Sequence, residues 1–109
     1  MKVKFYFNSH IARLLSVGAI TLYPFVFCRE DEDYCLKRDT IAHEMVHVQQ
    51  VRKLGWFAFY LDYLTTYFQL RFKGMDHTQA YYALPFEQEA YDHQTDKGLV
   101  DAYLKEKAK

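Results

Sequence analysis

The chain has few of the residues that mark loops and linkers. Only four glycines and two prolines occur among 109 residues, and no segment is rich in Gly, Ser or Pro. A flexible linker between two domains is therefore not expected. We predict one domain spanning residues 1–109, which is long enough to bury a single modest core.

Excess charge is also absent. Lys plus Arg and Asp plus Glu each number 14, so the formal net charge is zero. Without a basic stripe to bind phosphates, a nucleic acid is not an expected partner.

Two cysteines, Cys28 and Cys35, are too few for a disulfide scaffold. The spacing allows a bridge or two free thiols, so it does not fix the compartment. No cleavage-site pattern follows the apolar stretch near the N-terminus, which favours a cytoplasmic location slightly over secretion.

No apolar run reaches the roughly 20 residues that span a bilayer. The longest covers residues 56–70, where a narrow polar stripe at helical spacing interrupts it: Asp62, Thr65, Thr66 and Gln69. We predict a helix used in the core or in a dimer contact. A helix lying in a membrane interface is the less favoured alternative.

Aromatic residues, in contrast, are abundant. Ten Tyr, nine Phe and one Trp make up 18% of the chain. A domain of this size cannot bury all of them, so we expect some to line a groove or to form an exposed patch.

The most informative motif is His43-Glu44-Met45-Val46-His47. On a helix, residues four apart share a face, so both imidazoles can point at one ion. Zinc binds imidazole nitrogen and carboxylate oxygen, and a catalytic site leaves one position for water. Glu44 would be placed to accept a proton from that water.

The surrounding residues favour a helix that ends at Gly55. Ile41, Met45, Val48 and Val51 form its apolar stripe. Asp39 precedes this helix, where it could cap the first turn or hydrogen-bond a ligand imidazole.

A second helix is predicted just after Leu84, with Pro85 in its first turn. It carries Glu87 and Glu89, which differ by about 200° around the helix axis, so only one of them can face the ion.

The two histidines and the later Glu-x-Glu-Ala segment resemble the gluzincin metallopeptidases, in a minimal single-domain form. The resemblance implies a zincin-like fold, a zinc ion, a peptide or protein substrate, and a third ligand three residues before a small residue. That register selects Glu87, before Ala90, with Glu89 as the alternative ligand. Many gluzincins place an aspartate where this chain has Tyr91, so the imidazoles must be oriented differently here.

The fold class that follows is α+β: a mostly helical zincin-like domain with a small N-terminal β-sheet and an active-site helix that carries the motif. Residues 3–7 are predicted to form one strand and residues 19–27 another, with Pro24 favouring an edge position. Residues 21–27 could then pair with an extended peptide, unless the edge is covered.

The predicted function is zinc-dependent peptide hydrolysis, with zinc held by His43, His47 and Glu87. Tyr91 and His77 are candidates to donate to the oxyanion or to support a ligand. The alternative is a non-catalytic zinc-binding or interaction module with the same fold, including one associated with a membrane. A homo-oligomer is compatible with either function. A di-iron site is disfavoured because Glu89 and His93 are four residues apart rather than three.

Overall fold

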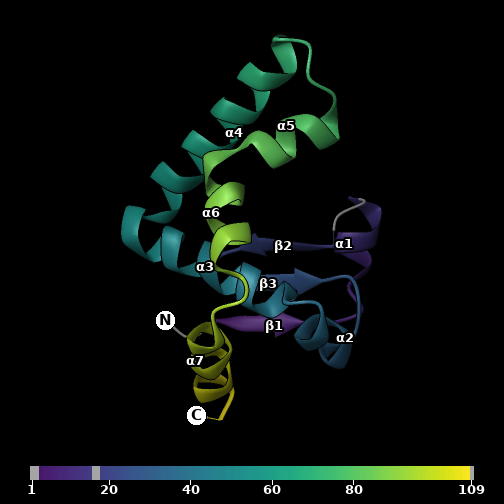
Figure 1. Ribbon diagram of the computed structural model, residues 1–109, viewed down its shortest axis with the longest axis vertical. Helices are drawn as coiled ribbons and strands as arrows, with labels where there is room; N and C mark the ends of the chain where they lie inside the picture. Colours follow the sequence, from purple (N-terminus) through teal and green to yellow (C-terminus); the bar gives the residue numbers. More distant parts are fainter. Residues whose placement is uncertain (1–2, 16–17, 109) are drawn as a thin grey trace.

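The computed structural model describes residues 3–15 and 18–108 of the chain. One helix, α3 (Thr40–Leu54), packs against β2 and against helices α2, α4, α6 and α7 (Figure 1). Its apolar side chains Ile41, Met45, Val48 and Val51 are all buried, as their helical spacing predicts. The mostly helical α+β class with a small N-terminal sheet is therefore confirmed.

The sheet has three strands in the order β1-β3-β2: β1 (Lys4–Tyr6), β2 (Ala19–Leu22) and β3 (Phe25–Cys28). β1 is parallel to β3, and β2 is antiparallel to it. The prediction of one strand over residues 19–27 was wrong, because Tyr23 and Pro24 form a turn between two strands. Pro24 lies in that turn, and the edge strand beside α3 is β2.

Two short helices, α1 and α2, flank the sheet. Ser9 caps α1 (His10–Leu14), and Asp31 caps α2 (Glu32–Lys37) by accepting from the Tyr34 amide. Acidic side chains in the first turn of α2 favour a helix there, because they face the positive end of its dipole.

Sharp corners delimit α3 at both ends. Asp39 adopts a left-handed conformation (φ 60°) between α2 and α3. Gly55 (φ 86°) alone separates α3 from α4 (Trp56–Phe72), and a side chain there would be strained.

The remaining helices follow as α5 (His77–Ala83), α6 (Pro85–His93) and α7 (Lys97–Ala108). A capping box between Asp76 and Gln79 starts α5, and Pro85 occupies the first turn of α6. Figure 1 shows α4 and α5 extending beyond the sheet at one end of the molecule, with α7 at the other end.

Of the two uses predicted for residues 56–70, the core or a dimer contact, the structure contradicts the first, and the second stays a prediction. Phe59 is the only fully buried residue that the structure describes in α4, and several large side chains of this helix face outward. Within residues 3–15 and 18–108, none of the helices has both the length and the apolar character needed to cross a membrane.

Candidate metal centre

Helix α3 places His43, Glu44 and His47 together in a buried position. Their relative exposures are 8%, 3% and 4%, and one ligand atom from each lies within 4.8 Å of the others. This buried His-Glu-His group could hold a metal ion.

Helix α6 brings Glu87 to the same point. Glu87 Oε1 lies 2.9 Å from His43 Nε2 and 3.1 Å from His47 Nε2, and Glu87 is 2% exposed. Atoms that bind one zinc ion tetrahedrally at about 2.1 Å lie roughly 3.4 Å apart. Glu87 Oε1 lies within about 0.5 Å of that spacing from both imidazoles, and Glu44 Oε2 lies 3.9 Å from His47 Nε2.

The other acidic residue of α6, Glu89, points elsewhere. Its Oε1 accepts a hydrogen bond from Gln50 Nε2 at 3.1 Å, and neither imidazole contacts it. This is the separation that the 200° difference around the helix predicts.

Each imidazole is oriented by a glutamine side chain. His43 Nδ1 donates to Gln94 Oε1 (3.0 Å), and His47 Nδ1 donates to Gln50 Oε1 (2.8 Å). Because an amide oxygen only accepts hydrogen bonds, these contacts place a hydrogen on each Nδ1 and direct both Nε2 atoms toward Glu87.

Asp39 has neither of the two roles considered for it. Its left-handed backbone is not the extended conformation of an N-cap residue, and its side chain makes no capping hydrogen bond. The imidazole of His43 pairs with Gln94 instead of Asp39.

A tyrosine of α4 fixes the second oxygen of Glu87. The Tyr63 hydroxyl donates to Glu87 Oε2 at 2.6 Å. Burial and the neighbouring Glu87 raise the pKa of Tyr63 far above its ordinary value, so the phenol stays a neutral donor.

The two carboxylates differ in their electrostatics. Burial raises the pKa of Glu44, and the nearby histidines offset this only in part. Burial would also raise the pKa of Glu87, but hydrogen bonds from His43, His47 and Tyr63 hold it well below its ordinary value. Glu87 is therefore the stronger anion, and Glu44 is the better proton acceptor.

The pKa of His47 is raised, whereas burial alone would lower it. Burial opposes its charged form, yet the hydrogen bond to Glu87 and the charge of Glu44 raise its pKa to about 9. The metal-free group therefore satisfies the Glu87 charge with a protonated imidazole.

Two buried side-chain oxygens, Thr21 Oγ1 and Glu44 Oε2, have no hydrogen-bond partner within the described part of the chain. Glu44 Oε2 is fully enclosed and makes no hydrogen bond there. His47 Nε2, at 3.9 Å, is too far away to donate a hydrogen bond to this oxygen. A buried carboxylate oxygen without a hydrogen bond is costly, so the site fits a metal ion with an associated water. The donor set of two imidazoles and one carboxylate is one that zinc uses in catalytic sites.

Glu44 and His43 open onto a cleft of about 410 Å³. Its walls come from the start of β2, from α3 and the corner before it, and from α5 and α6. His77 and Tyr91, the two candidates to donate to the oxyanion, are among the residues that line it. Tyr91 packs its ring edge-on against His43, with centroids 4.4 Å apart. His77 Nδ1 is hydrogen-bonded to the Tyr67 hydroxyl at 2.8 Å.

In comparisons with protein-family models, curated proteins and solved structures, none matches this chain. Interpretation of the site therefore depends on its own geometry and on the motif.

Sequence reasoning missed three supporting residues: Gln50, Gln94 and Tyr63. Gln50 follows His47 by three residues and so shares its helix face, which is a readable signal. Gln94 follows Glu87 by seven residues, about two turns. Tyr63 lies on a separate helix, and no sequence spacing relates it to Glu87.

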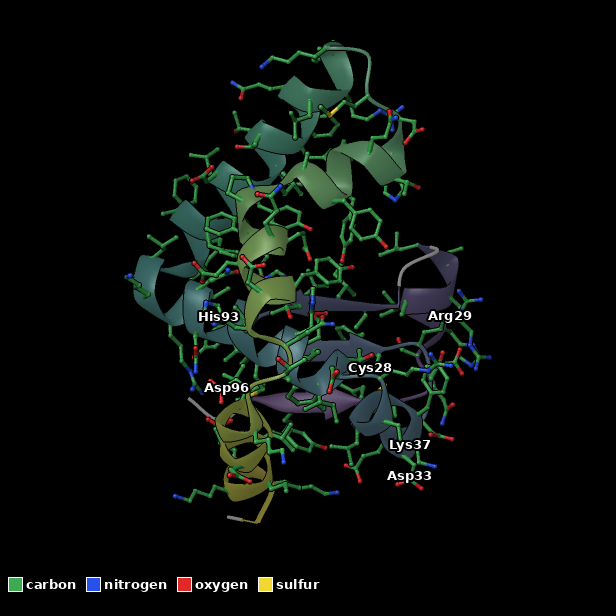
Figure 2. All side chains as sticks on the ribbon, in the orientation of Figure 1. Cys28, Arg29, Asp33, Lys37, His93 and Asp96 are labelled. Carbon is green, nitrogen blue, oxygen red and sulfur yellow. The ribbon has the colours of Figure 1, made fainter. Side chains whose placement is uncertain are left out.

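Neither cysteine belongs to the His43–Glu44–His47 group. Cys28 and Cys35 are both buried with free thiols, and Cys28 lies at the level of the sheet beside α2 (Figure 2). A hydrogen bond between the two thiols raises the pKa of Cys28 and lowers that of Cys35.

Proposed function

We propose that this protein is a zinc-dependent peptide hydrolase in which His43, His47 and Glu87 hold the ion and Glu44 is the general base. The observation that supports it most is the convergence of both Nε2 atoms on Glu87 Oε1, beside a buried Glu44 oxygen without a partner. A zinc ion, when bound, would supply Lewis acidity and lower the pKa of a water molecule.

Glu44 is assigned the proton transfers. Its carboxylate accepts a proton from water as the water oxygen bonds to the scissile carbonyl carbon. The same carboxyl group then gives that proton to the amide nitrogen as the carbon–nitrogen bond breaks. The raised pKa of Glu44 suits both transfers, because the group must gain and then lose one proton.

The polar groups around the ligands keep them in place during these transfers. Gln94 and Gln50 hold the imidazole rings, and Tyr63 holds the carboxylate of Glu87. Such partners fix the tautomer and the orientation of each ligand.

The cleft wall opposite α3 would bind the substrate carbonyl. Tyr91 and His77 both line this wall, and each carries a group that can donate a hydrogen bond to a developing oxyanion.

The edge strand β2 offers a docking site for the peptide main chain. The Arg29 amide donates to Gly18 O at 2.9 Å, which places the main-chain groups of Ala19 and Thr21 on the free edge. Tyr60 already donates to Thr21 O at 2.7 Å, whereas Ala19 lines the cleft. An extended peptide would pair at Ala19, and side chains on either side of that point would enter the cleft.

The test combines metal analysis with turnover of a fluorogenic peptide mixture. Glu44→Gln should retain one zinc ion per chain and lose at least a hundredfold in kcat. The matched control is Glu89→Gln, the same change at a carboxylate that faces away from the imidazoles, and it should keep most of the activity. Full turnover by Glu44→Gln would refute the role of Glu44. Bound zinc with no turnover of any peptide would favour the non-catalytic zinc module.

A further inference from the structure

Helix α4 has an apolar stripe on its outer side. Five large residues, here called the α4 stripe, follow one another at spacings of four, three, four and four: Phe57, Leu61, Leu64, Phe68 and Phe72. Their relative exposures lie between 52% and 90%, the highest being that of Phe72. Spacings of three and four keep side chains on one face of a helix, so the stripe is continuous.

The opposite side of α4 is already occupied. Phe59 is buried against Phe86 of α6, with ring centroids 4.7 Å apart, and Tyr63 is bound to Glu87. The residues that line the cleft include none from α4. The stripe therefore faces away from the metal centre, and a partner bound there would leave the cleft open.

The stripe is large enough for a stable interface. If a large apolar side chain presents about 200 Å², these exposures correspond to roughly 600 Å² per copy. Monomeric proteins rarely expose more apolar surface than this in one patch. The area matches one side of the smallest stable interfaces, which bury about 1,200 Å² in total, and Trp56, 64% exposed, adds to it.

The order of the residues suits a twofold axis. Reversal of the helix about a point between Leu64 and Thr65 exchanges position 57 with 72 and position 61 with 68. Leu64 then lies beside the axis. A twofold interface uses the same patch on both copies, so Phe57 would face Phe72, Leu61 would face Phe68, and Leu64 would meet its own counterpart across the axis.

We propose that a second copy of this chain covers the stripe, with the two α4 helices antiparallel around an axis next to Leu64. Spacings of three and four residues are those that interdigitate when two helices cross at a shallow angle. An anionic lipid surface fits less well, because Asp62 and Arg71 are the only charged residues of α4 and they cancel.

The first experiment measures mass by light scattering or sedimentation between about 1 and 100 µM. The unsubstituted protein should be a dimer at the upper concentrations, and Leu64→Glu should weaken association at least a hundredfold. Gln69→Glu is the matched control, because it introduces the same carboxylate at an exposed position of α4 outside the stripe. It should remain dimeric. Far-UV circular dichroism verifies that both variants fold.

The second experiment tests the register. Phe57→Cys and Phe72→Cys are prepared separately, mixed and oxidised with a disulfide reagent. The mixture should give a 57–72 crosslink between copies, while each variant alone should give little. The unsubstituted protein, whose cysteines are buried, measures the background.

Three outcomes would overturn the proposal. A monomer at every concentration excludes the second copy, and sedimentation of that monomer with phosphatidylglycerol vesicles would assign the stripe to lipid instead. A dimer unaffected by Leu64→Glu places the interface elsewhere. A 57–57 crosslink that forms as readily as the 57–72 crosslink excludes the antiparallel arrangement.

Discussion

Replacement of Tyr63 by phenylalanine tests the architecture of the metal centre most directly. The change removes one hydroxyl, which donates to Glu87 Oε2 at 2.6 Å, and leaves the ring in its contacts with Phe59 and Phe86. Glu87 is 2% exposed, so water cannot easily replace the lost donor.

The magnitude follows from the charge of the acceptor. A hydrogen bond to an ionised group contributes about 1.5–3 kcal/mol, and a buried acceptor left unpaired costs a similar amount. Tyr63→Phe should therefore lower the free energy of unfolding of the metal-free protein by roughly 1.5–3 kcal/mol. Zinc affinity should fall roughly tenfold to a hundredfold, since the Glu87 carboxylate is no longer fixed toward the imidazoles.

Two assays on the same variants separate these effects. Urea denaturation in the presence of a chelator gives the stability of the metal-free protein, and competition with a chromophoric chelator gives the zinc affinity. The control is Tyr67→Phe, one turn along α4, whose hydroxyl bonds to exposed His77. That change should alter stability by no more than about 0.5 kcal/mol. Equal stability and equal zinc affinity in the two variants would refute the role of Tyr63.

Three further predictions concern other parts of the molecule. Gln50→Ala should lower stability by about 1–3 kcal/mol and weaken zinc binding, because His47 Nδ1 and Phe86 O both lose a buried partner; an unchanged urea midpoint would contradict this. Ile41→Ala should cost about 2–5 kcal/mol in the same denaturation assay, since Ile41 is fully buried at the centre of the core, and a cost below about 1 kcal/mol would show that the site collapses around the cavity. Glu32 should contribute to acid sensitivity: Lys107 and Tyr103 hold its pKa below the ordinary value, so its stabilisation is complete above the unfolded-state pKa and disappears as the pH falls through the folded-state pKa. The Tm of the Glu32→Gln variant should therefore fall less than that of the unsubstituted protein between about pH 6 and pH 3. Identical curves of Tm against pH would rule out that contribution.

The two helices that build the site could be predicted from the sequence because their signals are local. Ile41, Met45, Val48 and Val51 recur at helical spacing, and Pro85 is compatible with a first turn. Helix geometry alone showed that only one of the two glutamates of α6 could face the histidines. The choice of Glu87 came from the gluzincin-like register, and Glu87 is the one that contacts both imidazoles.

Other features could not be predicted because they depend on how helices meet. The angle at Gly55 decides that Tyr63 reaches Glu87, and no periodicity encodes that angle. An apolar helix surface has the same sequence pattern whether it faces a core or a partner, so the sequence left both uses open for residues 56–70. The strand prediction was wrong because Pro24 was interpreted as a sign of an edge strand, whereas it lies with Tyr23 in a turn between two strands.

Gly55 alone joins α3 to α4, so a rotation of α4 about this corner would displace each residue in proportion to its distance from Gly55. With a rise of about 1.5 Å per residue, Tyr63 stands roughly 12 Å from the pivot and Phe72 roughly 25 Å. A swing that shifts the Tyr63 hydroxyl by a given amount therefore displaces the far end of the helix about twice as much. If α4 pivots as a rigid rod at Gly55, a spectroscopic label at Phe72 would move about twice as far as the Tyr63 hydroxyl.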